Sequence, residues 1–175
     1  NMEVSGFMLT GRIDSIHADG VTHFRYARFK AMDFLQAWLR HIALNAAGKE
    51  GYPRRSYLLG SAGAYEYTAV DEAEEIIAGF LKAYWAGLSK PCKFFPDSSW
   101  AYAQAVLING KSKERGAQEA RKIWERSDFG ERPGECDEPY FSLCFRNLDP
   151  LDTEFEGIAE EIFAPLIAHQ RDLQP

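Results

Sequence analysis

A carboxylate, a lysine and a glutamine are spaced along residues 14–36 in a way that suits chemistry on a phosphodiester. Asp14 ends one strand-like segment, Lys30 ends the next, and Gln36 lies near the start of the helix that we expect to follow. Two carboxylates can hold Mg²⁺, and a lysine beside them can help to position or activate the attacking water. These residues therefore raise the hypothesis of a nuclease-type site.

The order of these residues resembles the PD-(D/E)xK class of nucleases, in which an Asp at the end of one strand is followed by an acid-x-Lys on the next. Asp14 and Lys30 match that pattern and Gln36 is compatible with it, but Arg28 occupies the position of the second acid. One carboxylate beside two cations is a poor Mg²⁺ site, because the positive charges repel the ion and too few oxygen ligands remain. We therefore predict a degenerate site with no catalytic residue, no metal and no cofactor. An active Mg²⁺-dependent nuclease is the alternative.

The same residues also have ordinary structural explanations. Asp14 can form an ion pair with a cation near it in sequence: Arg12, Arg28 or Lys30. Asp33 followed by Gln36 fits a capping box at the start of a helix, and we favour this role for Gln36.

The charge of the chain is unevenly distributed. The net charge is −6, which excludes a uniformly basic nucleic-acid binder. Residues 1–60, however, carry 8 Lys and Arg against 5 Asp and Glu, whereas residues 61–175 carry 12 against 21. A local contact with a polyanion is therefore still compatible with the composition.

Cations and aromatic side chains alternate within the basic first third. The candidates for contact with DNA are Arg25, Arg28, Lys30, Arg54 and Arg55, and the aromatic residues near them are Phe24, Tyr26 and Tyr57. Arg28 and Lys30 would share a face if both lay in a strand. Such a combination can follow a phosphate backbone, and the alternative is a solvated face with salt bridges to the acidic helices.

Other chemistries leave no signature in the sequence. It contains no Walker-type phosphate loop, no dinucleotide-binding glycine motif, no H-E-x-x-H and no G-x-S-x-G. The three cysteines, Cys92, Cys136 and Cys144, are widely spaced, which predicts reduced thiols and no zinc site. No apolar run is long enough to span a membrane, and no signal peptide is visible, so we expect a cytoplasmic protein without membrane contact.

Hydrophobic periodicity predicts strands in the first 70 residues and helices afterwards. The strands are expected at 7–17 and 21–29, joined at Asp19-Gly20, and at 53–59 and 64–68, joined by a turn at 60–63. The helices are expected at 32–47, 71–88, 100–107, 114–127, 139–146 and 153–169, with a loop at 129–135. This order favours an α/β or α+β fold with a small, mainly antiparallel or mixed sheet flanked by helices, in a single domain over residues 1–175.

Several details of these helices can also be predicted. Gly48 is expected to end the helix at 32–47, and Thr153 with Glu156 to form a capping box at the start of the last helix. The helix at 71–88 is expected to bury a stripe made of Ala73, Ile76, Ile77, Phe80, Leu81, Tyr84 and Leu88. The helix at 114–127 is expected to direct Ala117, Ala120, Ile123 and Trp124 inward.

Short segments spread over nearly the whole chain resemble one family. Residues 9–11 read LTG, 27–42 read ARFKAMDFLQAWLRHI, 83–91 read AYWAGLSKP and 94–99 read FFPDSS. Residues 120–124 (ARKIW), 134–135 (GE) and 163–166 (FAPL) continue the series. In this order and spacing the segments resemble the carboxy-terminal domain of the exodeoxyribonuclease V gamma subunit, RecC. Cys92 departs from the aliphatic residue usual at its position.

The resemblance implies a non-catalytic scaffold and DNA-handling domain of the RecBCD helicase–nuclease, which acts in double-strand break repair and recombination. It implies RecB-like and RecD-like partners in a heterotrimer, and contact with double- and single-stranded DNA through the whole complex. It also implies a nuclease-like fold without a nuclease site, and a chain that is an excised fragment of a longer one. A protein-docking module without DNA contact is a further alternative, in which the acidic helices would form the more important surface.

Overall fold

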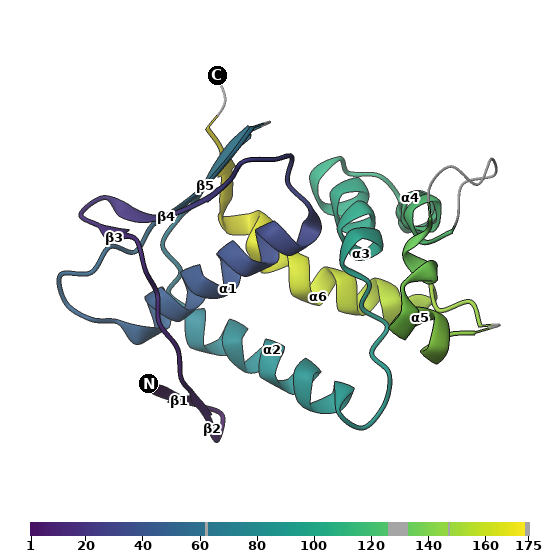
Figure 1. Ribbon diagram of the computed structural model, residues 1–175, viewed down its shortest axis with the longest axis horizontal. Helices are drawn as coiled ribbons and strands as arrows, with labels where there is room; N and C mark the ends of the chain where they lie inside the picture. Colours follow the sequence, from purple (N-terminus) through teal and green to yellow (C-terminus); the bar gives the residue numbers. More distant parts are fainter. Residues whose placement is uncertain (62, 126–132, 147, 174–175) are drawn as a thin grey trace. The chain divides into compact units, whose positions relative to one another are not determined.

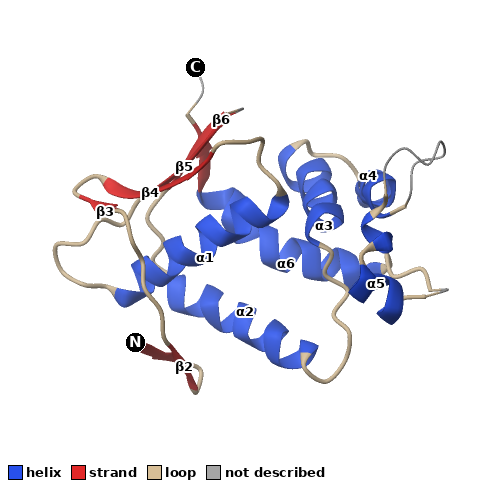
Figure 2. Ribbon diagram, viewed as in Figure 1, coloured by secondary structure: helices blue, strands red, loops and turns tan. Residues whose placement is uncertain are grey.

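The computed structural model describes residues 1–61, 63–125, 133–146 and 148–173, and its contacts divide the chain into two compact units. The first unit comprises Asn1–Trp85 and Ala168–Pro175, and the second comprises Ala86–Ile167. All the strands that the structure describes lie in the first unit (Figures 1 and 2). Within the described ranges, no helix combines the length and apolar composition that crossing a lipid bilayer requires. The single domain expected over residues 1–175 stays a prediction.

The first unit contains a two-stranded antiparallel sheet and a five-stranded mixed sheet (Figure 2). The small sheet pairs β1 (Met2–Val4) with β2 (Phe7–Leu9). The larger sheet has the order β3 (Ile16–His17), β4 (Gly20–Arg25), β5 (Ser56–Gly60), β6 (Gly63–Tyr67) and β7 (Gln170–Asp172). Only β4 and β5 are parallel neighbours; the other pairs of this sheet are antiparallel. The predicted mixed sheet flanked by helices is therefore confirmed.

The first two predicted strands are shorter than expected. The strand predicted at 7–17 is interrupted between Leu9 and Ile16, where Ser15 has a φ of 60° and cannot continue a β-ladder. The strand predicted at 21–29 ends at Arg25, because its parallel neighbour β5 turns toward β6 after Gly60. The hairpin between them is confirmed, but its paired residues are His17 and Gly20, so the loop lies one position earlier than predicted.

The helix α1 (Ala31–Ala47) connects the parallel strands β4 and β5 and covers one face of the sheet (Figure 1). Its Trp38 ring lies 5.7 Å from Tyr67 on β6, and Phe34 lies 5.4 Å from Tyr65. Gly48 ends the helix in the left-handed region with a φ of 52°, as predicted, because a residue without Cβ adopts this conformation at little cost.

The predicted capping box of Asp33 and Gln36 is wrong. Helix α1 begins at Ala31, so Asp33 is its third residue rather than its cap, and its carboxylate accepts a hydrogen bond of 2.7 Å from the backbone N–H of Lys30. Gln36 lies further inside the helix and is exposed. The carboxylate of Asp33, together with the backbone of Lys30, therefore stabilises the start of this helix.

A buried histidine links α1 to the sheet. His41 is fully buried; its Nδ1 lies 2.9 Å from Oγ of Ser56, and its Nε2 lies 2.9 Å from the carbonyl oxygen of Thr68. Desolvation by burial lowers the pKa of His41 to about 4, so the ring is neutral near pH 7. Because a carbonyl only accepts, Nε2 carries the proton and Nδ1 accepts from the Ser56 hydroxyl.

The helix α2 (Ala73–Gly87) buries only the first half of its predicted stripe. Ala73 and Ile77 are buried, whereas Tyr84 is 61% exposed. Leu88, at the end of the predicted stripe, is also exposed. The ring of Trp85 meets Phe7 of β2 edge-on at 5.7 Å, so the small sheet covers part of this helix.

The second unit is helical and has an aromatic core. Its helices are α3 (Pro96–Ala103), a π-helical turn (Gln104–Ile108), α4 (Lys113–Trp124), a 3-10 turn (Glu135–Asp137), α5 (Pro139–Cys144) and most of α6 (Thr153–His169). Phe95 lies at the centre of its core, with ring centroids 4.2 Å from Trp124 and 6.0 Å from Phe155. Ala120 and Trp124 point inward as predicted, but Ile123 is exposed.

The start of α6 differs from the prediction. The side chain of Asp152 accepts hydrogen bonds from the backbone N–H groups of Glu154 (3.1 Å) and Phe155 (3.3 Å), so Asp152 caps this helix and the predicted capping box of Thr153 and Glu156 is wrong. Three predicted features lie partly outside the described residues: the turn at 60–63 (residue 62), the end of the helix at 114–127, and the loop at 129–135.

Candidate nucleic-acid interface

The residues of the predicted nuclease-type site lie around the β3–β4 hairpin and the start of α1. Asp14 precedes β3, Arg28 and Lys30 lie in the connection between β4 and α1, and Gln36 lies on α1. The structure therefore has the predicted order of elements: Asp14 comes before a hairpin, and Arg28 and Lys30 come between the hairpin and a helix. Arg28 and Lys30 do not lie in a strand, however, because β4 ends at Arg25, and the expectation that they share a strand face is wrong.

Asp14 is engaged by a neighbour in sequence. Nε of Arg12 donates to its carboxylate at 2.6 Å, and both side chains are largely exposed. In the part of the chain that the structure describes, no three His, Cys, Asp or Glu side chains gather into a group that could hold a metal ion. Three ion pairs were considered for Asp14, and the structure shows the one with Arg12.

Three of the five candidate DNA-contact cations have acidic partners. Nη1 of Arg25 donates to both carboxylate oxygens of Asp33, at 2.5 and 2.6 Å, and this pair ties the end of β4 to the first turn of α1. Arg54 donates to Asp71 at 2.7 Å and also to Asn45 and the carbonyl of Val70. Arg55 pairs with Glu66 on β6 at 3.2 Å. These three arginines therefore form ion pairs within the first unit.

The other two cations are available for external contacts. Arg28 and Lys30 are exposed, and neither forms an ion pair with any residue in the described ranges. Asp33, the acid closest to them in sequence, is already bonded to Arg25 and to the backbone of Lys30. The connection between β4 and α1 thus carries uncompensated positive charge.

Contacts with α1 identify which side chains of the sheet face the helix. Ser56 bonds to His41, Tyr67 packs on Trp38, and Tyr65 packs on Phe34. Because side chains alternate between the two faces of a sheet, the residues between these strand positions point to the opposite face. We call this opposite face of the five-stranded sheet the outer face.

The register defines two rows of side chains on the outer face. One row contains Thr22, Tyr57, Glu66 and Arg171. The next contains Phe24, Leu59 and Ala64, and Leu173 continues it, since its N–H donates to the carbonyl of Ala64 at 2.9 Å. Phe24 is 80% exposed, Leu59 39% and Leu173 44%. The second row is therefore an apolar band that crosses β4, β5 and β6 and continues to the residue after β7.

The two other aromatic residues of the predicted cluster differ in exposure. Tyr57 is half-buried, because its ring lies over Gly20, where a Cβ would approach the ring to 2.8 Å. Tyr26, one residue beyond β4, is fully exposed. The carbonyl of Ala27 still accepts a hydrogen bond from Ser61 at 3.3 Å, so the chain continues alongside β5 past Tyr26. Phe24, on the outer face, and Tyr26, where the backbone bends after β4, are therefore two exposed rings close together in sequence.

Part of this surface could not be found from the sequence. Phe24, Tyr26 and Tyr57 were identified by their alternation with cations, but Leu59, Arg171 and Leu173 were not. Arg171 and Leu173 reach the sheet through β7 and its continuation, which are distant in sequence from the other strands. In the sequence, Arg171 and Leu173 belong to a short segment of mixed apolar and charged residues after the last helix. This segment does not indicate which strand it pairs with.

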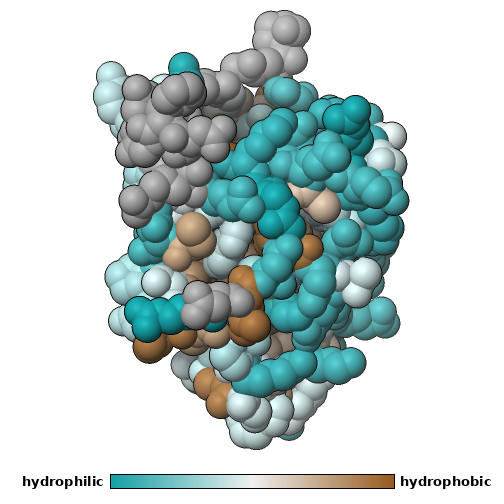
Figure 3. All heavy atoms as spheres, turned by 90° about the vertical axis from the view of Figure 1, so that its right-hand side faces the viewer, coloured by the Kyte–Doolittle hydropathy of each residue, from teal (hydrophilic) through white to brown (hydrophobic). Residues whose placement is uncertain are grey.

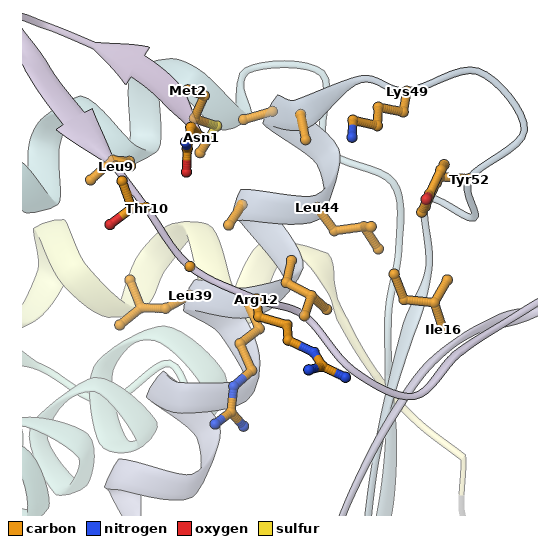
Figure 4. Close-up of a pocket in the computed structure, with 16 residues that line it drawn as sticks. Asn1, Met2, Leu9, Thr10, Arg12, Ile16, Leu39, Leu44, Lys49 and Tyr52 are labelled. Carbon is orange, nitrogen blue, oxygen red and sulfur yellow. The ribbon is translucent and has the colours of Figure 1, made fainter.

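A pocket of about 580 Å³ lies elsewhere in the first unit, between the N-terminal segment and α1. Its labelled lining residues are Asn1, Met2, Leu9, Thr10, Arg12, Ile16, Leu39, Leu44, Lys49 and Tyr52 (Figure 4). Arg40 also lines it, and no Asp or Glu does. The pocket has the size of a site for a small organic molecule, and it combines apolar walls with three cations, of which Arg12 is paired with Asp14.

The surface of the second unit also has exposed apolar side chains. Tyr140, Leu143 and Leu148, on and after α5, are among its most exposed hydrophobic residues. Figure 3 shows hydrophobic residues in small patches on a mainly hydrophilic face. Lys93 pairs with Asp152 and Glu154, and Arg121 pairs with Glu125 and Asp149, so many acids of this unit are neutralised locally.

Comparison with protein families gives one match. Residues 1–107 match the family described as the RecC C-terminal domain. This segment contains both sheets except β7, together with α1, α2 and α3. The search of curated proteins found no match. Because the matched segment covers more than half of the 175 residues, the chain belongs to the RecC C-terminal domain family.

Proposed function

We propose that this chain is a non-catalytic scaffold and DNA-handling domain of a RecBCD-type helicase–nuclease, acting in double-strand break repair and recombination in the cytoplasm. Membership of the RecC C-terminal domain family is the observation that carries this proposal. Its partners are RecB-like and RecD-like subunits in a heterotrimer, and double- and single-stranded DNA reaches it through the whole complex.

The proposal includes a nuclease-like origin of the fold with a degenerate site. The order of Asp14, a hairpin, Arg28-x-Lys30 and a helix supports this origin, as does the β4–α1–β5 unit that follows the hairpin. Arg28 in the position of a metal-binding acid argues against catalysis, since a guanidinium repels a divalent cation and supplies no ligand oxygen. Asp14, paired with Arg12, is then a surface carboxylate.

An assay with divalent ions separates this proposal from an active nuclease. The chain is incubated with Mg²⁺ or Mn²⁺ and with labelled single-stranded or duplex DNA, and the products are resolved by denaturing electrophoresis. We expect no cleavage above the level of an Asp14→Ala variant. Asp19→Ala, which removes another exposed carboxylate of the same hairpin region, is the matched control. Cleavage that is lost in Asp14→Ala but kept in Asp19→Ala would establish an active nuclease.

Assembly is tested by co-expression of the subunit that contains this chain with its RecB-like and RecD-like partners. We expect the three to co-purify at constant stoichiometry through gel filtration. Failure of the complete subunit to associate with either partner would contradict the proposed role in the complex.

A docking module without DNA contact is the second candidate. It is favoured by the acidic partners of Arg25, Arg54 and Arg55, which leave fewer free cations than the sequence suggested, and by the exposed apolar side chains near α5. Such a module would join the complex but show no salt-dependent affinity for DNA, and charge reversal at Arg28 would change neither property.

A further inference from the structure

We propose that the outer face of the five-stranded sheet binds single-stranded DNA, with bases stacked on Phe24 and Tyr26 and phosphates held by Arg28 and Lys30. This inference rests on the proposed function and deepens it, because it names the surface and the form of DNA. The pocket beside α1 and the apolar side chains near α5 are separate features and take no part in it.

The two aromatic side chains are placed for stacking. Phe24 is 80% exposed and Tyr26 is fully exposed, whereas large aromatic residues usually bury most of their surface. They are two residues apart in sequence, so their Cα atoms are at most about 7 Å apart. This separation suits successive bases of an extended single strand, and stacking on aromatic rings is tolerant of base sequence.

The surroundings of Phe24 are apolar across the sheet. Leu59 lies beside Phe24 in the register, and Ala64 and Leu173 extend the same row. β3 pairs with Gly20 and Val21, and no strand in the described ranges pairs with the same edge of β4 beside Phe24. A base stacked on Phe24, which is 80% exposed, would therefore lie next to an apolar surface.

The charges near the aromatic residues complement a phosphate backbone. Arg28 and Lys30 follow Tyr26 by two and four residues, and within the described ranges their side chains have no acidic partner. Arg171 stands on the outer face, and Glu66 in the same row is paired with Arg55. Exposed cations are thus present both in the connection after β4 and on the outer face, and a polyanionic ligand requires such cations.

Fluorescence anisotropy with a labelled oligothymidylate tests the stacking residues. We expect salt-dependent binding to the chain, and a loss of affinity of about tenfold or more in the Phe24→Ala, Tyr26→Ala double variant. Tyr26→Trp should keep the affinity, because an indole also stacks. The matched control is Tyr140→Ala, which removes an equally exposed aromatic ring from the second unit and should change nothing. Both side chains are exposed, so circular dichroism should show an unchanged fold.

The phosphate contacts are tested by the dependence of affinity on salt. Replacing Arg28 and Lys30 by Ala should flatten the slope of log K against log salt by about 0.7 for each lost phosphate contact on a single strand. Arg12→Ala, which removes a cation already paired with Asp14, should leave the slope unchanged. Duplex of the same sequence should bind more weakly than the single strand, since its bases are not free to stack.

Two results would overturn the inference. One is the absence of measurable oligothymidylate binding, and the other is binding that the Phe24→Ala, Tyr26→Ala variant retains in full. If that variant instead fails to assemble with the partner subunits, the outer face is a protein-docking surface and the inference is wrong. If the variant assembles normally but no longer binds DNA, the inference is supported. If the complete subunit without any substitution fails to assemble, that result counts against the proposed function and not against this inference.

Discussion

At the scale of single residues, His41 shows how a polar side chain can be a required part of a core. Its neutral ring donates to Thr68 and accepts from Ser56, which connects α1 to β5 and to the residue that follows β6. Trp38 stacks on it at 5.5 Å, so a charged imidazolium would have no water around it. The protonated form is therefore strongly disfavoured in the folded state.

This burial predicts that the protein loses stability as the pH falls from about 6.5 to about 4. Over that interval the unfolded chain protonates His41 while the folded chain, with a pKa lowered to about 4, does not. The unfolded state then binds more protons, so the free energy of unfolding decreases, by up to about 3 kcal/mol for this group. His23, whose pKa is lowered by burial and by Arg40, acts in the same direction.

Urea unfolding at pH 7 and pH 5 measures the effect. A His41→Asn variant is expected to be less stable at both values but to show a smaller difference between them. His17→Ala, which removes an exposed histidine, should retain the full difference. An unchanged pH dependence in His41→Asn would show that another group is responsible.

The residues also show the limits of sequence reasoning about the site. The order of Asp14, Arg28, Lys30 and Gln36 is readable from the chain, but the partners of the arginines are not. Arg54 pairs with Asp71, and Arg55 with Glu66, across contacts that depend on the tertiary fold. The sequence alone does not distinguish the five cations, whereas the ion pairs of Arg25, Arg54 and Arg55 in the fold separate them from Arg28 and Lys30.

At the scale of the elements, helices were predicted better than strands. The helix at 153–169 has its predicted bounds and α1 begins one residue earlier than predicted, because an apolar period of 3.6 residues and local end signals define a helix within its own segment. β2 and β3 were predicted as one strand because strand limits depend on which chain lies alongside. β7 was missed for the same reason, since its three residues have no signal without β6.

The capping of α6 gives a prediction at this scale. Asp152→Ala should lower the free energy of unfolding by about 1 kcal/mol, because the N–H groups of Glu154 and Phe155 lose their acceptor. Asp152→Asn keeps an acceptor but loses the ion pair with Lys93, so it should cost less. Thr153→Ala, at the position wrongly predicted to cap the helix, should have little effect. Chemical denaturation curves of the three variants would rank them, and a larger cost for Thr153→Ala would contradict the assignment.

At the scale of the whole molecule, the first unit is assembled from two separate stretches of the chain. β7 supplies its outermost strand, and His169 stacks on Trp38 at 5.9 Å. The second unit is therefore inserted in sequence between β6 and β7. This arrangement could not be predicted from composition, because the charge and hydrophobicity of residues 170–172 are unremarkable for an exposed tail.

Truncation tests the importance of this arrangement. Ending the chain after Ile167 removes β7 and the contacts of His169, which exposes the edge of β6 and one side of Trp38. We expect lower thermal stability and concentration-dependent aggregation, since an uncovered edge pairs with other strands. Ending the chain after Leu173 keeps the ladder and should behave like the full chain. Equal thermal transitions for the two truncations would show that β7 contributes nothing.

The late strand also has a consequence for synthesis on the ribosome. Gln170 and Tyr67 are hydrogen-bonded although they are 103 positions apart in the sequence. While the intervening helices are being translated, β6 has no neighbour on one side, and the nascent sheet presents an unsatisfied row of N–H and C=O groups. Pairing over such a separation is slow, so this is the stage at which a chaperone or a neighbouring polypeptide has the longest opportunity to bind the unfinished edge.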